Sequence, residues 1–536
     1  MTRAVLVGTA GIVWLAFPST TITGTSAVAL PRAGPVAPAA APRQDGTSGD
    51  DLVLPLVAVG AAGVLAVYGY VRRTHRARTR TTPGGGDRDG ADRHGADRHG
   101  ADRHGTDGGD GGPRAGGPGR PPLTALEARV CDALVLADDC VRTSREELGF
   151  AEARSGTEAC APFARAVRQA ETEVAAAFRT RQRYDEGVPD PADDRARRRA
   201  LADMTGRCEE AGRLLDAAAT QFDALRGLDR EESLGEALVL AETRFRELAG
   251  RTTATEQIVA ALHERYAPTA CEPVTGYVEQ AKDRLMFATA HLNQARQAAD
   301  RGGHTRAAAE LRAAEGAVVQ VAVFLDAVSS LAEDLEEAAS LVPAALSGAE
   351  AARAGAEDRL TGVPAGEVRA RVLHAGAVLT SIRRELTSGR AYDPLGVLRR
   401  VVAATAPLGA VRAGVLSAAA LLTARSAVAA AEGFITTHRG AVGATARARL
   451  AEAQRLLAAE DSAVLPRADA LARTARDLAE QDVRTHGNPY AEADAHTPGT
   501  AGALRGGILL PGPSPTGAAP SYGGPGKRKR RARHAS

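Results

Sequence analysis

The residues best suited to metal binding lie in a short repeat near the amino terminus. His94, His99 and His104 each end a Gly-Ala-Asp-Arg-His unit, and histidine-rich tracts of this kind can bind metal ions. A five-residue spacing in a glycine-rich stretch gives no preorganised ligand geometry, so we interpret the repeat as a flexible charged linker. His263-Glu264 lacks the second histidine of a zinc protease motif. The histidine pattern therefore predicts no metal site.

The sequence also lacks the motifs of a catalytic nucleophile and of a phosphate-binding loop. The sequence contains neither a GxxxxGK[ST] loop nor a GxSxG nucleophile elbow. The five cysteines have no CxxC spacing, which argues against a zinc site and against a disulfide framework. We expect three of them to pack as small apolar residues in helix seams: Cys131, Cys208 and Cys271. The sequence thus predicts a protein that is not an enzyme and that uses no cofactor.

A basic run at the carboxyl terminus could bind an anionic surface. Each basic residue close to an anionic membrane contributes about 1 kcal/mol. Weak nucleic-acid binding is an alternative, but a formal net charge of +2 lacks the basic excess of a nucleic-acid-binding protein. A solvated tail without a partner is another. We predict lipid contact at both ends of the cytoplasmic part: Arg72, Arg73, Arg76, Lys527, Arg528, Lys529, Arg530 and Arg531.

Two apolar segments open the chain. An apolar stretch followed by Ala27-Val28-Ala29 predicts a signal peptide over residues 1–29, with an uncleaved anchor as the alternative. Leu52–Val71 has 20 residues without a charge, enough for a helix to cross a ~30 Å hydrocarbon layer. Arginines directly after this run place its carboxyl end in the cytoplasm. We predict a single-pass plasma-membrane protein with residues 30–51, a short disordered segment, outside the cell.

Composition predicts helices for the remaining chain. Aromatic residues make up 3% of the 536 residues, whereas 44% are hydrophobic, with alanine the main contributor. Such a composition cannot fill the faces of a β-rich domain, but it suits helices that approach closely. Gly- and Pro-rich stretches bound the helical part. We predict a basic then Gly-rich disordered linker over 72–122, a cytoplasmic helical body over 123–484, and a disordered tail with a basic end over 485–536.

Apolar residues recur along this body in steps of four and three. One seam comprises Leu234, Leu238, Ala241, Phe245, Leu248, Thr252, Thr255, Val259, Leu262 and Tyr266, and another comprises Leu201, Met204, Cys208, Ala211, Leu215, Ala218, Phe222 and Leu225. This spacing is typical of long packed helices. We predict an all-α fold of elongated antiparallel helical hairpins, a coiled-coil-like bundle tethered to one transmembrane helix.

Prolines and glycines indicate where the helices end. Asp190, between Pro189 and Pro191, is a plausible helix N-cap. Gly302-Gly303 closes another helix, and the stretch from Gly440 to Gly443 separates two more. Later breaks are predicted at Pro343, Pro364, Pro394 and Pro407.

Several stretches of the body are similar to a known family. They are Thr143–Phe150, Ala161–Phe163, Arg265–Pro268, Val278–Leu285, Leu292–Arg296 and Arg439–Gly443. Together they resemble the cytoplasmic helical region of actinobacterial TPM-domain membrane proteins, over nearly all of residues 123–489. The resemblance implies a signal peptide, an extracytoplasmic TPM domain, one span and then this helical region. Only residues 30–51 are available outside here, too few for a TPM domain, so the family's phosphatase-like activity does not carry over.

These observations leave three hypotheses. The first is a non-enzymatic, single-span membrane protein whose cytoplasmic scaffold binds protein partners, or itself through helical seams, at the cell envelope. The second is a module that binds anionic membrane lipids with its amphipathic helices and basic tail. The third is a TPM-family phosphatase-like protein that has lost its catalytic domain.

Overall fold

The computed structural model describes residues 121–360, 366–409, 414–459, 461–486 and 521–527. All of them belong to the second of the two units into which the chain divides, Pro113–Ser536. The predicted signal peptide, outside segment and membrane span lie outside the described residues, as does the predicted linker apart from its last two positions. Those assignments stay predictions.

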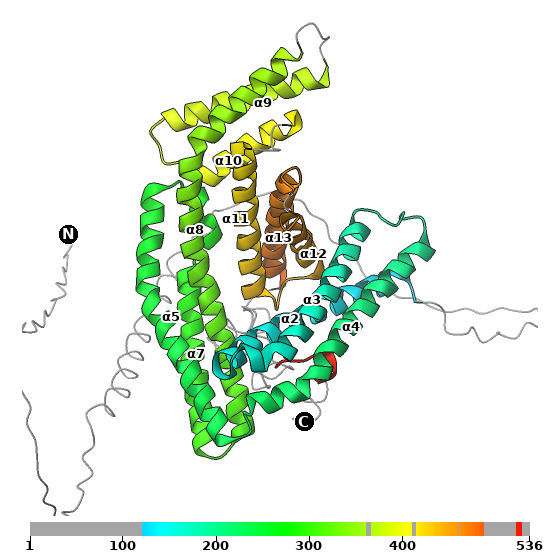
Figure 1. Cartoon of the computed structure of the whole chain (residues 1–536), viewed down its shortest axis with the longest axis vertical. Coiled ribbons are helices and arrows are strands. Elements are labelled where there is room, and N and C mark those ends of the chain that lie inside the picture. Colours follow the sequence, from blue (N-terminus) through cyan, green and yellow to red (C-terminus); the bar gives the residue numbers. More distant parts are fainter. Residues whose placement is uncertain (1–120, 361–365, 410–413, 460, 487–520, 528–536) are drawn as a thin grey trace, which may run out of the picture. The chain divides into compact units, whose positions relative to one another are not determined.

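The described residues form an all-α structure, as the composition predicts, with no β-strand among them (Figure 1). The α-helices are α2 (Leu123–Ser155), α3 (Thr157–Asp185), α4 (Asp194–Arg226), α5 (Glu231–Arg265), α6 (Pro268–Cys271), α7 (Tyr277–Asp300), α8 (His304–Asp358), α9 (Glu367–Thr387), α10 (Pro394–Thr405), α11 (Gly414–His438), α12 (Ala444–Leu457) and α13 (Leu465–His486). Two short 3-10 turns cover Glu272–Val274 and Ala406–Leu408.

The predicted helix ends are confirmed at several positions and wrong at two. Asp193, not Asp190, caps α4, and its carboxylate accepts the N–H of Ala196 at 2.9 Å. Asp190 instead accepts the N–H of Ala192 in the preceding turn. Pro343 does not break a helix, because α8 continues through it to Asp358.

Burial explains why α8 tolerates this proline. An interior proline removes one backbone hydrogen bond and strains the preceding turn. Val342, Ala345, Leu346 and Ala349 recur with helical spacing around Pro343, and all four are buried. Packing on this face holds the helix across the defect. Pro394, by contrast, begins α10, where a missing N–H costs nothing.

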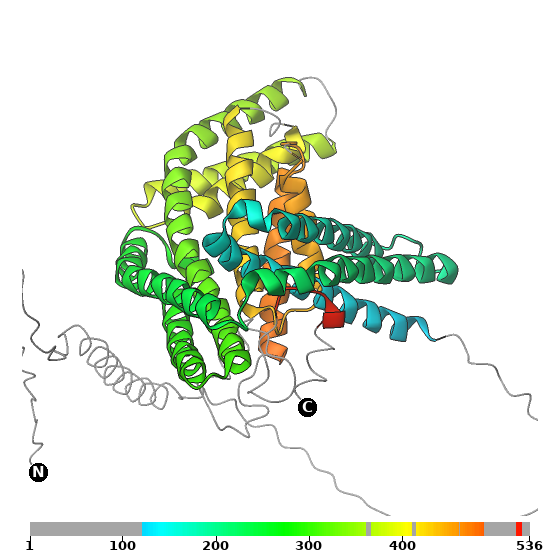
Figure 2. The same cartoon turned by 60° about the horizontal axis from the view of Figure 1, so that its bottom comes forward.

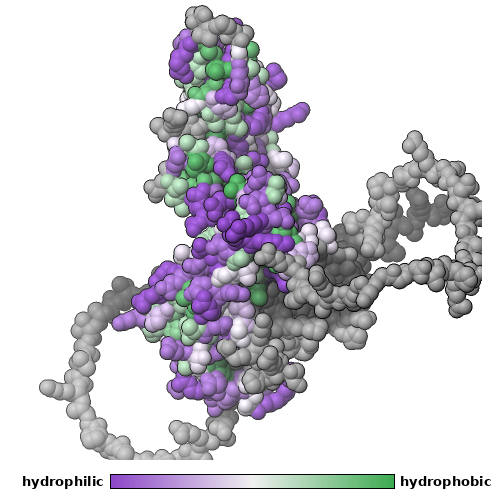
Figure 3. Space-filling model, turned by 90° about the vertical axis from the view of Figure 1, so that its right-hand side faces the viewer, coloured by the Kyte–Doolittle hydropathy of each residue, from purple (hydrophilic) through white to green (hydrophobic). Residues whose placement is uncertain are grey.

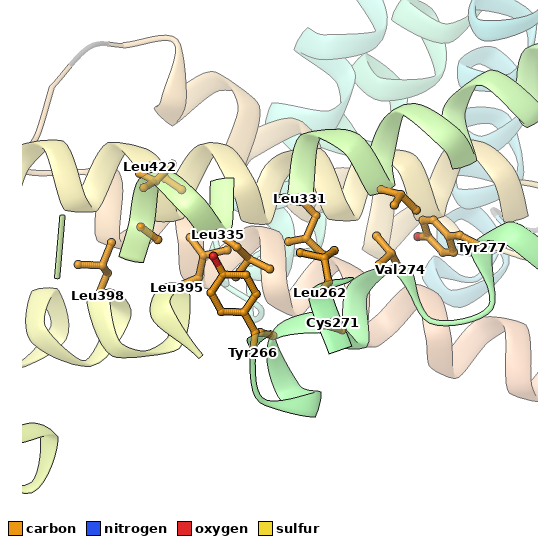
Figure 4. Close-up of a cluster of buried hydrophobic side chains, with 14 of the residues drawn as sticks. Leu262, Tyr266, Cys271, Val274, Tyr277, Leu331, Leu335, Leu395, Leu398 and Leu422 are labelled. Carbon is orange, nitrogen blue, oxygen red and sulfur yellow. The ribbon is translucent and has the colours of Figure 1, made fainter. Parts of the chain in front are cut away.

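The largest core surrounds α8 and includes buried residues of α5, α7, α10 and α11. Figure 4 shows Leu331 and Leu335 of α8 among side chains from the α5–α7 connection and from α10 and α11. The predicted seam from Leu234 to Tyr266 supplies part of this core, since Leu248, Leu262 and Tyr266 are buried in it. Alanine lines much of the rest, which lets the helices approach closely.

A second core forms between α2, α3 and α4. The predicted seam on α4 is confirmed, because Leu201, Met204, Leu215 and Phe222 are all buried within it. Helix α12 covers one side of this group, through Ala444 and Ala448. The three helices and the short red segment that lies against them are visible in Figures 1 and 2.

Two of the described helices are long and apolar enough to cross a membrane, namely α8 and α11. In each, 56% of the most apolar window is buried inside the structure. Core helices of this kind pass the same length and composition test, so α8 and α11 are weak indicators of membrane association. Neither coincides with the predicted span at residues 52–71.

Candidate peptide-binding groove

A seven-residue segment near the carboxyl terminus, Ser521–Lys527, lies against α2, α3 and α4; we call it the tail segment. The structure differs here from the sequence-based expectation of a disordered tail over 485–536. Tyr522 is fully buried, with 0% of its surface exposed. Its ring stacks on Phe222 at a centroid distance of 4.1 Å and meets Phe163 edge-on at 6.1 Å. The aromatic side chain therefore fills a slot between α3 and α4.

The polar end of Tyr522 is also satisfied. Its hydroxyl donates to the main-chain oxygen of Phe163 at 3.0 Å. Burial raises the pKa of the phenol, so the group stays protonated and remains a donor at neutral pH. A phenylalanine would fill the slot but lose this hydrogen bond.

The groove recognises the main chain of the segment as well. The N–H groups of Tyr522 and Gly523 donate to Glu147 and, at 3.1 Å, to the hydroxyl of Ser144, both on α2. Asp216 on α4 accepts three further N–H groups, from Gly524 at 3.2 Å, from Gly526 at 2.9 Å and from Lys527 at 2.8 Å. One carboxylate thus fixes the turn at the end of the segment.

Two glycines allow this close approach. A Cβ atom on Gly524 would lie 2.2 Å from the main-chain oxygen of Gly212, and a Cβ on Gly212 would lie 2.9 Å from the Pro525 ring. Neither separation is tolerated between heavy atoms. The main chain of the segment therefore lies directly on the main chain of α4.

Lys527 closes the segment. Its ammonium group donates to Asp223 at 2.8 Å and to the main-chain oxygen of Tyr522 at 2.7 Å, and the residue is 7% exposed. The tail groove thus comprises Ser144, Glu147, Phe163, Gly212, Asp216, Phe222 and Asp223. It provides an aromatic slot, a set of main-chain acceptors and an acidic pocket for one cation.

A buried ionic cluster supports the floor of the groove. The guanidinium group of Arg312 on α8 contacts Glu147 at 2.7 Å, and that of Arg226 binds both carboxylate oxygens of Glu315 at 2.7 and 2.8 Å. Burial alone would raise the pKa of Glu147, but Arg312, Arg226 and Lys527 together hold it at about 2. Glu147 is therefore a buried anion that joins α8 to the tail segment.

This pKa predicts acid sensitivity. The folded-state pKa of Glu147 lies below its unfolded value of 4.5, so its contribution to stability is complete above that value and is lost as the pH falls toward 2. At 1.36 kcal/mol per pKa unit the loss is about 3 kcal/mol. Denaturation midpoints measured between pH 6 and pH 2 should fall steeply for the wild-type chain. They should fall less steeply for Glu147→Gln; equal slopes would show that Glu147 does not carry the effect.

A second ionic cluster fixes α2 from its other side. Arg447 on α12 contacts Asp138 at 2.6 Å and Asp139 at 2.7 Å, and Arg439 pairs with Glu146 at 2.6 Å. Arg447 is almost fully buried. Helix α2, which carries Ser144 and Glu147, is therefore held in place by charges from a distant part of the chain.

The glycine contacts provide a matched test of the groove. Gly206 and Gly212 both lie inside α4, but a Cβ on Gly206 meets nothing within 4 Å. Gly206→Ala should raise the free energy of unfolding by up to ~1 kcal/mol, because alanine is the better helix former. Gly212→Ala gains the same propensity but meets Pro525, so its net gain should be smaller and its tail segment should become accessible to proteolysis. Equal behaviour of the two variants would contradict the contact.

The groups in the tail groove bind the segment and have no free nucleophile among them. In the part of the chain that the structure describes, no three His, Cys, Asp or Glu residues come close enough to hold a metal ion. Burial raises the pKa of the Cys208 thiol to about 12 and raises that of Cys271, so both stay protonated and pack as small apolar residues. Cys131 is only half-buried, and its sulfur accepts a hydrogen bond from Arg181 at 3.1 Å.

The structure separates the residues predicted to contact lipid. Lys527 belongs to the tail segment, where its ammonium group pairs with Asp223 at 2.8 Å. The other seven lie outside the described residues: Arg72, Arg73, Arg76, Arg528, Lys529, Arg530 and Arg531. Tyr522, Asp216 and Glu147 were not predicted from the sequence. The one available signal was a Tyr-Gly-Gly triplet in a tail otherwise poor in aromatic residues.

The chain is homologous to two curated mycobacterial proteins. It is 31% identical over 416 residues to UPF0603 protein MT2410 and to UPF0603 protein Rv2345, from two strains of Mycobacterium tuberculosis. The match includes 73% of this chain and 62% of each relative, so the chain spans less than two thirds of their length. No protein-family model matches the chain. No solved structure matches it either.

Proposed function

We propose that this protein is a non-enzymatic scaffold at the cell envelope whose helical body binds protein segments in the tail groove. The observation that carries the proposal is the seated tail segment. Its ring, five of its main-chain N–H groups and its one ammonium group all have partners on α2, α3 or α4. An aromatic anchor, main-chain hydrogen bonds and a charge pocket are the features by which peptide-recognition domains select their ligands.

The rest of the described surface favours the groove as the place of binding. The exposed large apolar residues are scattered over several elements: Leu136, Val188, Val239, Met286, Val368, Leu373 and Leu421. Figure 3 shows one face, on which hydrophilic side chains surround smaller apolar areas. Interfaces that depend on area alone need a broad apolar patch. A groove that uses hydrogen bonds and one aromatic anchor does not.

The predicted span at residues 52–71 and its arginine flank place this scaffold on the cytoplasmic side of the plasma membrane in our proposal. The apolar helices α8 and α11 are compatible with membrane association, although both are largely packed in the core. The resemblance to the helical region of TPM proteins supports the same arrangement. The anionic-lipid hypothesis remains the alternative and would rest on the amphipathic helices, on Arg72, Arg73 and Arg76, and on the basic tail, of which Lys527 pairs with Asp223.

A comparison of two full-length variants tests the proposal. Tyr522→Ala frees the groove of its own tail, and Tyr522→Ala combined with Gly212→Leu also fills the groove. Both are used to capture proteins from membranes of the source cells. We expect proteins that the single variant retains and the double variant loses. Identical captured sets would mean that the groove does not bind partners.

A further inference from the structure

The described contacts in the tail groove involve both side chains and main-chain groups of the tail segment. The hydrogen bonds that Tyr522, Gly523, Gly524, Gly526 and Lys527 make as described above reach α2, α3, α4 or the segment itself. Three features would distinguish this segment from other peptides: the ring of Tyr522, the bare main chain of Gly524 and the ammonium group of Lys527. None of these contacts depends on how the segment is joined to the rest of the protein.

We propose that the groove also accepts the tail segment of a second copy, so that two copies associate by exchanging tails. This inference rests on the proposed function, since it names the partner of the same groove. The ligand is defined by the chemistry of the groove: a peptide that presents Tyr-Gly-Gly-Pro-Gly-Lys. Every copy of the chain carries that ligand.

The length of the connection permits the exchange. Between α13 and the tail segment lie residues 487–520, a 34-residue stretch rich in glycine and proline. A chain of 34 residues has a maximum extended reach of about 110 Å. A neighbouring groove is within that reach. The tail of the neighbouring copy competes for that groove at an effective concentration in the millimolar range. Exchange therefore increases as the copies become more concentrated.

Charge and symmetry favour the same partner. Asp216, Asp223 and Glu147 make one end of the groove acidic, and the incoming segment is followed directly by Arg528-Lys529-Arg530-Arg531. Opposite charges of this kind speed encounter and exclude acidic competitors. Reciprocal exchange between two copies fills both grooves, so the assembly closes as a dimer instead of growing into a chain.

Two complementary full-length variants in detergent test the exchange. Tyr522→Ala has a usable groove but no usable tail, and Gly212→Leu has a usable tail but a filled groove. We expect each alone to sediment as a monomer and the equimolar mixture to form a one-to-one complex, at least about tenfold tighter than either self-association because no tail competes in cis. Gly206→Leu, with the same substitution at an open position of α4, controls for folding and should not pair with Tyr522→Ala at low concentration.

A labelled peptide of residues 519–529 distinguishes failure of the tail exchange from failure of the proposed function. If the peptide binds the Tyr522→Ala chain but the mixed variants remain monomers, the exchange is overturned and the groove stands. If the peptide does not bind, the proposed function fails with it. Binding of the peptide together with one-to-one association of the mixture supports both.

Discussion

Replacing Tyr522 with alanine is expected to release the tail segment from its groove. The ring is fully buried and stacked on Phe222, and truncation of such a ring costs about 3–5 kcal/mol. A loss of that size lowers the ratio of docked to undocked segment by more than about a hundredfold. Lys527 then leaves Asp223, and the peptide bond after Lys527 becomes accessible to trypsin. Mass spectrometry of a timed digest measures that cleavage.

The conservative variant Tyr522→Phe is the control for this result. It keeps the ring in its slot and loses only the hydrogen bond from the hydroxyl to Phe163, which contributes about 1 kcal/mol. Cleavage after Lys527 should therefore accelerate about fivefold, far less than in Tyr522→Ala, because proteolysis of an opened segment follows its open population. If all three chains are cut at the same rate, the segment is not held by its aromatic side chain.

Glu147→Gln should be the most destabilising single substitution in the groove. The glutamine is nearly isosteric and can still accept the N–H of Tyr522, but it removes the carboxylate that Arg312 contacts at 2.7 Å in a buried site and leaves Arg312 only the longer pair with Asp223 at 3.8 Å. Removing one partner of a buried ion pair costs about 3–5 kcal/mol. We expect both the unfolding midpoint in urea and the affinity for the tail segment to fall.

Glu158→Gln is the matched control, because Glu158 is an exposed glutamate near the start of α3. Surface changes of that kind stay within about 0.5 kcal/mol. A Glu147→Gln chain as stable as Glu158→Gln would show that the ionic cluster beneath the groove contributes little.

The helical class followed from the sequence because periodicity and composition are local. The seam on α4 predicted Leu201, Met204 and Phe222 as core residues, and all three are buried. Pro343 shows the limit of local rules. Its effect on α8 depends on whether neighbouring helices hold the turn, and that is a property of packing, which a single sequence does not display.

The groove could not be predicted for a related reason. Asp216 and Lys527 are 311 residues apart, and Glu147 and Tyr522 are 375 apart. Glycine, proline and basic residues are typical of disordered tails. The composition therefore did not indicate a segment whose order comes from its binding site. The triplet Tyr522-Gly523-Gly524 was the remaining indication, because a tyrosine followed by two residues without side chains can lie flat on a helix.

Amide hydrogen exchange of the full-length chain tests most directly whether the tail segment occupies its groove. The N–H groups of Gly523, Gly524, Gly526 and Lys527 all donate to side chains of α2 or α4. We predict that they exchange at least about a hundredfold more slowly than in a free peptide of residues 519–529, and that Gly212→Leu abolishes this protection. Exchange at the rates of the free peptide in the wild-type chain would contradict the account.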